Sequence, residues 1–500
     1  MSTAAANLAS VLLSDAEHAP DRPAVVADHL RVSLGAVATY TAAASAWLAD
    51  QGVRPGDVVV LGFPDGPGWI AAFLGTVRLG AVAALVGDSL GPERAQSLVD
   101  RSGARIVLAD RTDLRGVRVA SGVSFAAGMA AGFPDPGVHP VGSSDPCYML
   151  ATSGSTGPSK WVVHAHGDIP ACIATYGRRV LKMVPGDVSW SVAALATSYG
   201  LGNSLYFPLG AGAAAWLGGG RDPSSAATAC REGGVTAMFG VPTFWARLAR
   251  HVRDGRVDSR DFASVRLSVS AGEHLPDAVW RAVEHETGMR LVNGLGSSEA
   301  TNLYLSDRAG APRAGTIGWP VPGYDMRVGE SERPIPGDEG ELSVRGPTVM
   351  SGYLDDPNAT ARAMADGWLR TGDLVRREPD GSYRFLGRSG DVFKAGALWI
   401  DPLRVQEVLL EDPEVHDAVA IGAPDDDAVT RLVAVVAAPG ARAEVLVPRL
   451  QALCRSRLEA HAIPRVIHVT DGLPAAPSGK VRRDAVREMA EHALRATGGR

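Results

Sequence analysis

The segment TSGSTGPSK, from Thr152 to Lys160, concentrates hydroxyl side chains and two glycines in front of one lysine. Glycine lets backbone N–H groups approach an anion closely, the hydroxyls add donors, and the lysine supplies compensating charge. These groups suit a triphosphate. The spacing of Gly154 and Gly157 excludes a Walker A loop. Composition alone leaves a solvated surface loop as an equal alternative.

Two histidines, His164 and His166, follow this loop on a predicted strand. Such a pair can bind a metal ion, but no third ligand lies near it in the sequence, so packing or hydrogen bonding is the favoured interpretation. The four cysteines are far apart and form no CxxC pair, which excludes a zinc site and a disulfide framework. These cysteines favour a reducing cytoplasm as the setting.

The overall composition is that of a globular protein with more than one domain. A chain of 500 residues exceeds one ordinary core, and its hydrophobic fraction is 46%. A net charge of −6 gives no electrostatic reason to expect a nucleic acid or a membrane as partner. No apolar run is long enough to span a bilayer, and the N-terminus lacks the basic region of a signal peptide.

Short apolar strands alternate with helical stretches through the first two thirds of the chain. This β-α-β rhythm predicts an α/β fold with parallel sheets covered by helices. The clearest examples are strands over 57–63, 81–87 and 104–110 and helices over 69–80 and 93–103.

The pattern changes twice in the last third. Between residues 321 and 385 turn signals and short alternating strands predict a small β unit, with a hairpin turn at 379–381. After residue 388 a compact α+β pattern follows, with helices over 401–411 and 447–461 and a helix at the end, and strands over 417–423, 431–438 and 465–470. We therefore predict a large domain over 1–387 and a small C-terminal domain over 392–500, joined by residues 388–391.

Further motifs follow the hydroxyl-rich loop in order: GLGSSEA (294–300), WLRTGDL (368–374), GRSGDVFKAG (387–396) and LPAAPSGKVRRDAV (473–486). Their order and spacing resemble the adenylate-forming superfamily, which includes acyl- and aryl-CoA ligases, stand-alone adenylation domains and luciferases. The resemblance covers nearly the whole chain. Segments 197–213, 268–276 and 293–306 are most similar to the benzoate-type aryl-CoA ligases.

This resemblance implies a two-step reaction. A carboxylate attacks the α-phosphate of ATP to give an acyl-adenylate and pyrophosphate, and a thiol then expels AMP. ATP, Mg²⁺ and CoA are the implied cofactors, with the phosphopantetheine arm of a carrier protein as the alternative to CoA. The small domain is implied to be mobile and to present a different face in each step.

The resemblance also assigns residues to the nucleotide. Lys480 matches the catalytic lysine of the family, Glu299 its Mg²⁺-binding glutamate, and Lys160 a clamp on the outer phosphates. Thr156 is a second predicted metal ligand. The predicted ATP and AMP site is completed by Thr152, Ser153, Gly154, Ser155, Thr156, Gly157, Gly272, Glu273, Asn293, Gly294, Gly296, Ser297, Ser298, Asp373 and Arg388. Asp373 would accept the ribose hydroxyls.

The pocket for the acid is predicted at Ser198, Tyr199, Gly202 and Asn302. Benzoate ligases often carry Ala and His where Ser198 and Asn302 stand. Plain benzoate would leave these two polar groups unpaired, at roughly 1–3 kcal/mol each, which favours a hydroxy- or amino-substituted aromatic acid. In the alternative, either side chain faces water or backbone.

Other positions bear on the second step. Lys394 and Gly396 would lie on the face that admits the thiol, and Gly390 occupies the hinge position where the family usually has Asp or Lys. The chain departs from the family pattern at further positions, namely Ser159 and Trp161 beside the loop lysine and Arg404 and Gln406 in the C-terminal part.

No departure removes an adenylation group, whereas the changes at Gly390, Arg404 and Gln406 lie in the segment that serves the second step. Loading of a separate carrier protein, transfer to an amine, and a non-catalytic nucleotide-binding relative remain as alternatives.

Overall fold

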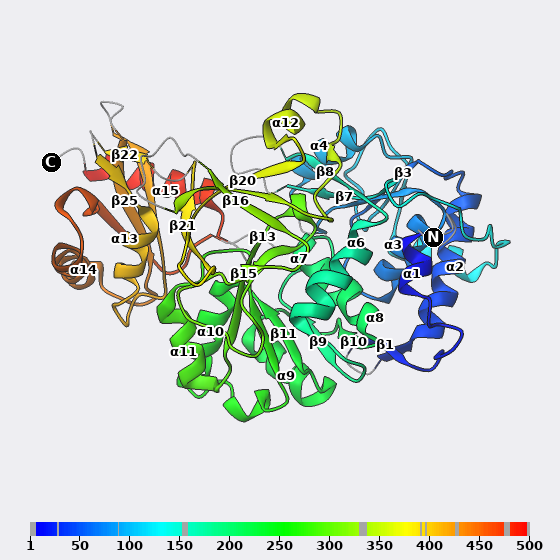
Figure 1. Cartoon of the computed structure of the whole chain (residues 1–500), viewed down its shortest axis with the longest axis horizontal. Helices are drawn as coiled ribbons and strands as arrows, with labels where there is room; N and C mark the ends of the chain where they lie inside the picture. The colour runs from blue at the N-terminus through cyan, green and yellow to red at the C-terminus, as the bar shows by residue number, and fades with distance from the viewer. Residues whose placement is uncertain are drawn as a thin grey trace.

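The computed structural model describes residues 7–27, 30–88, 90–152, 159–329, 338–390, 393–395, 398–425, 430–474 and 481–497. Figure 1 shows α1 (Leu8–Leu12) and α2 (Leu34–Asp50) at one end of the long axis and the C-terminal elements, coloured orange to red, at the other. The sheets between them carry the segments that the sequence motifs single out.

The first sheet is mixed, with strand order β15-β14-β13-β12-β11-β9-β10-β1-β2. Its strands run parallel from β1 through β10, β9, β11 and β12 to β13, and its edges are antiparallel. The strands are β1 (Pro23–Ala27), β2 (Leu30–Ser33), β9 (Val188–Ser191), β10 (Ala214–Trp216), β11 (Ala237–Gly240), β12 (Leu267–Ser270), β13 (Leu291–Gly296), β14 (Leu303–Ser306) and β15 (Trp319–Pro320). The central strands are buried because helices cover a parallel sheet on both faces.

The second sheet has the order β18-β8-β7-β4-β3-β5-β6. Strands β7, β4, β3, β5 and β6 run parallel, while β8 and β18 are antiparallel additions beside β7. The strands are β3 (Val58–Leu61), β4 (Val82–Leu85), β5 (Ile106–Leu108), β6 (Val119–Ala120), β7 (Pro146–Ala151), β8 (Trp161–Ala165) and β18 (Gly352–Tyr353). The hydroxyl-rich loop thus joins two adjacent antiparallel strands, β7 and β8.

Helices follow most of the parallel strands, as the β-α-β rhythm predicts. They are α3 (Pro67–Arg78), α4 (Pro92–Ser102), α5 (Gly122–Ala130), α6 (Asp168–Cys172), α7 (Ser198–Leu201), α8 (Phe207–Ala211), α9 (Pro223–Gly233), α10 (Pro242–Arg253), α11 (Asp277–Thr287) and α12 (Pro357–Ala363). Two π-helical segments, η2 (Ile173–Leu181) and η3 (Gly202–Tyr206), and two 3₁₀ turns, η4 (Ser259–Phe262) and η5 (Ser298–Ala300), accompany them. Local sequence sets their ends. The Asp222 side chain caps α9 by accepting from the N–H groups of Ser224 and Ser225, and Gly234, in the left-handed conformation, ends it.

The small β unit is antiparallel and has the order β16-β17-β20-β19, with β21 paired to β20. Its strands are β16 (Asp325–Gly329), β17 (Glu339–Arg345), β19 (Met364–Ala365), β20 (Trp368–Arg377) and β21 (Tyr383–Arg388). The predicted turn at 379–381 joins β20 and β21, and Gly381 has a φ of +80°, which glycine tolerates. The predicted hairpin is confirmed.

The C-terminal part is α+β, as predicted. Its elements are β22 (Phe393–Ala395), β23 (Leu398–Ile400), α13 (Pro402–Leu409), β24 (Asp417–Pro424), β25 (Thr430–Ala437), α14 (Ala443–Arg457), η6 (Ala460–Ala462), β26 (Val466–Thr470) and α15 (Arg483–Thr497). The predicted start of one helix, at residue 447, is wrong. Proline favours the first turn of a helix, but α14 begins at Ala443 and continues through Pro448.

Buried apolar side chains form separate clusters in the two parts of the chain. The clusters of the large part extend to Tyr383, and those of the C-terminal part begin at Ile400. Among the described helices, none is both long and apolar enough to cross a bilayer. The predicted fold class, α/β with parallel sheets, a small β unit and an α+β C-terminal part, is confirmed.

Candidate active site

The predicted nucleotide segments meet at the carboxyl ends of parallel strands in the first sheet. Gly240, Ser270 and Asn293 lie side by side in register at the ends of β11 and β12 and within β13. Gly272 and Glu273 follow β12, and the GLGSSEA motif runs from the end of β13 into η5. The carboxyl ends of parallel strands are where open α/β sheets bind ligands.

The glycines at the end of β13 have a packing reason of their own. A Cβ on Gly296 would lie 2.2 Å from the Asn302 carbonyl oxygen, and one on Gly294 would lie 2.9 Å from that of Leu305. These approaches arise because β14 folds back on β13. The two glycines are therefore required by the fold whether or not a nucleotide is present.

The ends of the hydroxyl-rich loop are tied together. The Thr152 N–H donates to the Lys160 carbonyl at 2.9 Å, and the Lys160 N–H donates to the Thr152 hydroxyl at 2.9 Å. Residues 153–158 lie outside the described residues, so the predicted contacts of Ser153, Gly154, Ser155, Thr156 and Gly157 stay predictions.

Two of the departures from the family pattern anchor this loop to helix α4. The Ser159 hydroxyl accepts from the Arg94 guanidinium at 2.9 Å, and the Trp161 indole N–H donates to the Leu98 carbonyl at 3.1 Å. Both side chains are buried. The usual Pro and Gly are thus replaced by residues whose side chains tie the end of the loop to helix α4.

Lys160 and Glu299 meet across one tyrosine. The Lys160 ammonium lies 4.9 Å from the centre of the Tyr353 ring, and the Tyr353 hydroxyl donates to Glu299 Oε1 at 2.9 Å. Tyr353 stands on β18, which pairs with β8, the strand that begins directly after Lys160. Burial and the Glu299 carboxylate raise the pKa of Tyr353. Sequence reasoning missed this residue, although it ends the turn-rich segment RGPTVMSGY.

The buried Asp373 and the exposed Arg388 form an ion pair in the small β unit. They lie directly opposite each other in the β20–β21 ladder, and Arg388 Nε lies 2.8 Å from Asp373 Oδ1. The Tyr304 hydroxyl donates to Asp373 Oδ2 at 3.1 Å. Burial raises the pKa of Asp373 to about 6, against the lowering effect of Arg388. The register therefore brings together two residues that sequence analysis assigned to the ribose.

The residues predicted to line the acid pocket lie close together at helix α7, turn η3 and the start of β14, but the expectation that Asn302 is unpaired is wrong. Asn302 Nδ2 donates to the Ser198 carbonyl at 3.3 Å and to the Tyr206 hydroxyl at 3.1 Å, and its Oδ1 accepts from the Leu303 N–H at 3.0 Å. Gly202 is needed beside it, because a Cβ there would lie 2.5 Å from Asn302 Nδ2. The Asn302 amide already has protein partners, so plain benzoate would not leave it unpaired.

A second asparagine, missed from the sequence, has the property expected of Asn302. Asn203 is fully buried, and its amide lies against the Tyr199 phenol. Apart from this contact, neither Oδ1 nor Nδ2 has a hydrogen-bond partner among the described residues. The Tyr199 hydroxyl donates to the Val269 carbonyl at 3.2 Å, next to the row of strand ends. The signal available in the sequence was the spacing of four residues from Tyr199 along a helix.

The C-terminal part contacts the large part beside this site. Glu273 Oε1 accepts from the Val481 N–H at 2.8 Å, and His274 Nε2 lies 3.5 Å from Glu407 Oε1. Lys480 and Gly396 lie outside the described residues, as does the side chain of Lys394. Gly390 is exposed in the turn after β21, and a Cβ there would meet open space.

Glu407 directly follows the two C-terminal departures from the family pattern. Arg404 lies 3.3 Å from Glu407, and Gln406 is the residue before it. The carboxylate that contacts the large part therefore stands beside both changed positions.

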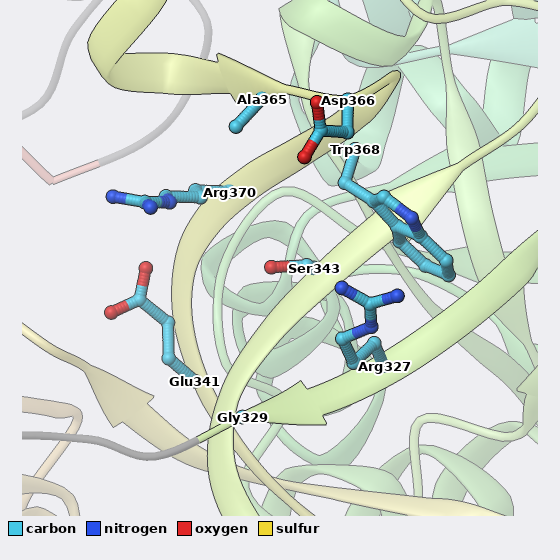
Figure 2. A pocket seen from close by; sticks show the side chains of 8 residues that line it. All are labelled: Arg327, Gly329, Glu341, Ser343, Ala365, Asp366, Trp368 and Arg370. Carbon is cyan, nitrogen blue, oxygen red and sulfur yellow. The ribbon is translucent and has the colours of Figure 1, made fainter.

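A hollow of about 440 Å³ lies elsewhere, on the face of the small β unit. Figure 2 shows Trp368 beside Arg327 on one side of it and Glu341 and Arg370 on the other. The Arg327 guanidinium lies 4.3 Å from the centre of the Trp368 ring. Of the predicted site residues that the structure describes, none lines this hollow.

Comparison with known proteins places these features in a family. The model of the AMP-binding enzyme family matches residues 12–354, and that of the AMP-binding enzyme C-terminal domain matches 404–480. The benzoate–CoA ligase of Thauera aromatica is 32% identical, over 89% of this chain and 88% of its own length. The p-hydroxybenzoic acid–AMP ligase FadD22 of Mycobacterium tuberculosis is 32% identical, over 97% of this chain and 69% of its own.

A solved structure is similar over almost the whole length. The anthranilate CoA ligase AuaEII, in complex with anthranoyl-AMP, superposes with a TM-score of 0.90 at 28% identity, covering 97% of this chain and 98% of its own.

Proposed function

The chain belongs to the family of AMP-binding enzymes, and from this membership we propose that it activates an aromatic carboxylic acid with ATP. In the first step a carboxylate oxygen attacks the α-phosphorus, the bond to the bridging oxygen of pyrophosphate breaks, and an acyl-adenylate forms. In the second step the sulfur of CoA attacks the acyl carbon, the thiol proton is released and AMP leaves. The enzyme is then an AMP-forming acid–thiol ligase.

The observation that supports this proposal most is the cluster of Lys160, Tyr353 and Glu299. It places one cation, from the residue that ends the hydroxyl-rich segment, and one carboxylate, from the GLGSSEA turn, on a single tyrosine. Bringing a carboxylate to a triphosphate builds negative charge, which fixed cations and backbone donors stabilise. We assign Lys160 to the outer phosphates and Glu299 to the metal ion that accompanies them.

The residues present fit a magnesium ion of this kind. Within the described residues no group of three His, Cys, Asp or Glu side chains could hold a metal by itself. Mg²⁺ usually binds through one or two carboxylates plus substrate phosphates and keeps several waters, so Glu299 alone suffices. The ion would neutralise phosphate charge while Lys160 and the loop hold the phosphates in place.

The Asp373–Arg388 pair is proposed to hold the ribose. A carboxylate accepts hydrogen bonds from two adjacent hydroxyls, and Arg388 keeps the buried carboxyl ionised. The boundary between domains is proposed at 387, with the hinge over 388–391. It lies in the gap between the apolar clusters that end at Tyr383 and those that begin at Ile400.

Relatives of the chain support an aryl acid as the substrate, since they are named for benzoate, hydroxybenzoates and anthranilate. Transfer to a separate carrier protein is the second candidate for the second step, because FadD22 is named as an acid–AMP ligase. A cytoplasmic setting is part of the proposal, supported by four cysteines that are all buried and free.

The function is tested by measuring pyrophosphate released from ATP with a panel of aromatic acids, in the presence and absence of CoA. We expect acid-dependent release with one or more benzoates and an aryl-CoA product when CoA is added. Adenylate formation without any CoA product would favour the carrier protein. Absence of acid-dependent release across aromatic acids, or equal release with alkanoic acids, would contradict the proposal.

Replacing Asn203 with leucine should reduce discrimination between acids. Leucine is close in volume but cannot pair with a ring hydroxyl or amino group. A site that loses such a bond loses about 1–3 kcal/mol, so the preference of kcat/KM for hydroxy- or aminobenzoate over benzoate should fall roughly 10- to 100-fold. Activity with benzoate itself should be retained or rise. An unchanged preference would show that Asn203 does not contact the ring substituent.

Affinity for ATP should fall as the pH drops through the pKa of Asp373. That pKa is raised to about 6. The ionised form of the ribose-binding carboxyl therefore outnumbers the protonated form roughly tenfold at pH 7, and the protonated form outnumbers the ionised form roughly tenfold at pH 5. The measurement is KM for ATP from pH 5 to 8. Asp373→Asn should bind weakly at every pH and lose this dependence. Asp307→Asn, which removes another buried carboxyl whose pKa is about 7, should keep it.

A further inference from the structure

The histidine nearest the loop is part of a buried pair that the reaction scheme does not use. His164, at the end of β8, and Asp168, at the start of α6, are both buried. His164 Nδ1 lies 2.8 Å from Asp168 Oδ2, and His164 Nε2 lies 2.7 Å from the Ser298 carbonyl oxygen. The Tyr148 ring stacks on the imidazole at 4.9 Å between ring centres.

Three groups contact this imidazole. The Ser298 carbonyl can only accept, so the His164 Nε2–H donates to it. On the other side of the ring, Nδ1 faces the Thr301 hydroxyl at 3.2 Å and Asp168 Oδ2, which also accepts from the Ala165 N–H at 3.1 Å. His164 is thus held from one side and holds the Ser298 carbonyl with the other.

The carbonyl that His164 holds belongs to the turn that carries Glu299. Each carbonyl of this turn, η5, accepts one hydrogen bond from the surrounding frame. The donors are His164 to Ser298, the Met350 N–H to Glu299 at 2.8 Å, and the Thr348 hydroxyl to Ala300 at 2.7 Å. The next residue, Thr301, has a φ of +65°, which a β-branched residue adopts only where its surroundings impose it.

His164 differs from the other two donors in its position. It stands on β8, the strand that begins directly after Lys160. Its bond to Ser298 therefore joins the strand of the loop lysine to the turn of the metal-binding carboxylate, across 134 residues of sequence.

We propose that the His164–Asp168 pair positions Glu299 relative to Lys160. Glu299 can then bind the metal ion while Lys160 binds the outer phosphates of the same nucleotide. This inference rests on the proposed role of Glu299. Residues that orient a metal ligand from outside commonly change metal affinity by about 10- to 100-fold when replaced.

The test measures metal binding directly, with Mn²⁺ titrated against the full-length protein saturated with a non-hydrolysable ATP analogue and followed by electron paramagnetic resonance. His164→Ala should weaken Mn²⁺ binding at least tenfold. His164→Gln, which keeps an N–H donor of similar reach, should recover part of this loss. Asp168→Asn, which keeps the volume but removes the charge, should fall between His164→Ala and the unchanged protein.

Kinetics separate positioning from a general loss of structure. The Mg²⁺ concentration for half-maximal pyrophosphate release should rise in His164→Ala, while KM for the acid stays unchanged. If all three variants bound Mn²⁺ as tightly as the unchanged protein, the inference would be overturned. Glu299→Gln separates the metal-binding role of Glu299 from the positioning role of the His164–Asp168 pair. If Glu299→Gln also leaves Mn²⁺ binding unchanged, Glu299 does not bind the metal. If Glu299→Gln alone weakens Mn²⁺ binding, only the positioning role is wrong.

Discussion

Replacing Lys480 with alanine is expected to abolish acid-dependent pyrophosphate release while leaving the conversion of supplied aryl-adenylate to thioester largely intact. The lysine is proposed to bridge the attacking carboxylate and the α-phosphate, where both reactants are anions. Removing one preorganised donor at such a position typically costs about 10²- to 10³-fold in rate. The measurement is each half-reaction alone, by pyrophosphate release and by aryl-CoA formation from synthetic adenylate.

One contact supports this role, although Lys480 itself lies outside the described residues. The N–H of Val481, which belongs to the peptide bond that joins it to Lys480, donates to Glu273 beside the strand ends. Lys182→Asn is the matched control, because it removes an exposed lysine and asparagine tolerates the left-handed φ of +50° there. Equal loss of both half-reactions in Lys480→Ala would contradict the assignment.

Replacing Glu299 with glutamine should slow adenylation by a similar factor and raise the Mg²⁺ concentration that half-maximal activity requires. Glutamine keeps the shape of the side chain and can still accept from the Tyr353 hydroxyl, but it lacks the charge that binds a divalent cation. The measurement is acid-dependent exchange of pyrophosphate into ATP over a range of Mg²⁺ concentrations.

Tyr353→Phe provides the control for Glu299→Gln. It removes the hydroxyl that donates to Glu299 but leaves the carboxylate and the ring under Lys160. We expect a loss of about 5- to 30-fold, smaller than that of Glu299→Gln, since one hydrogen bond contributes about 1–2 kcal/mol. A Glu299→Gln enzyme with normal Mg²⁺ dependence would show that the carboxylate does not bind the metal.

Some features of the site were accessible from the sequence because they are local. The β-α-β rhythm, the hairpin at 379–381 and the hydroxyl-rich loop between two strands each depend on short-range propensity and turn chemistry. Asp373 and Arg388 could be assigned to the same ligand by their motifs. Their direct opposition across β20 and β21, however, is a matter of register.

Other features depended on partners far away in the sequence. Asn302 was expected to present an unpaired amide to the acid, yet Ser198 and Tyr206, about a hundred residues earlier, use that amide. Asn203 was overlooked, and its burial against Tyr199, with no other partner in the part of the chain that the structure describes, is visible only when the helices are packed. An asparagine reads the same in the sequence whether or not its amide has hydrogen-bond partners, so the sequence does not show which amide is paired.

Residue types and their spacing along the chain were enough to identify the family, the order of the motifs and the kinds of side chain available for adenylation. The packing of distant segments was needed to learn which of those side chains can meet a ligand and which hold the fold together. Ser159 and Trp161 anchor the loop, His164 holds the Glu299 turn, and Glu273 holds the segment after Lys480. The physical reason is that a hydrogen bond acts over about 3 Å, while these partners are tens to hundreds of residues apart along the chain.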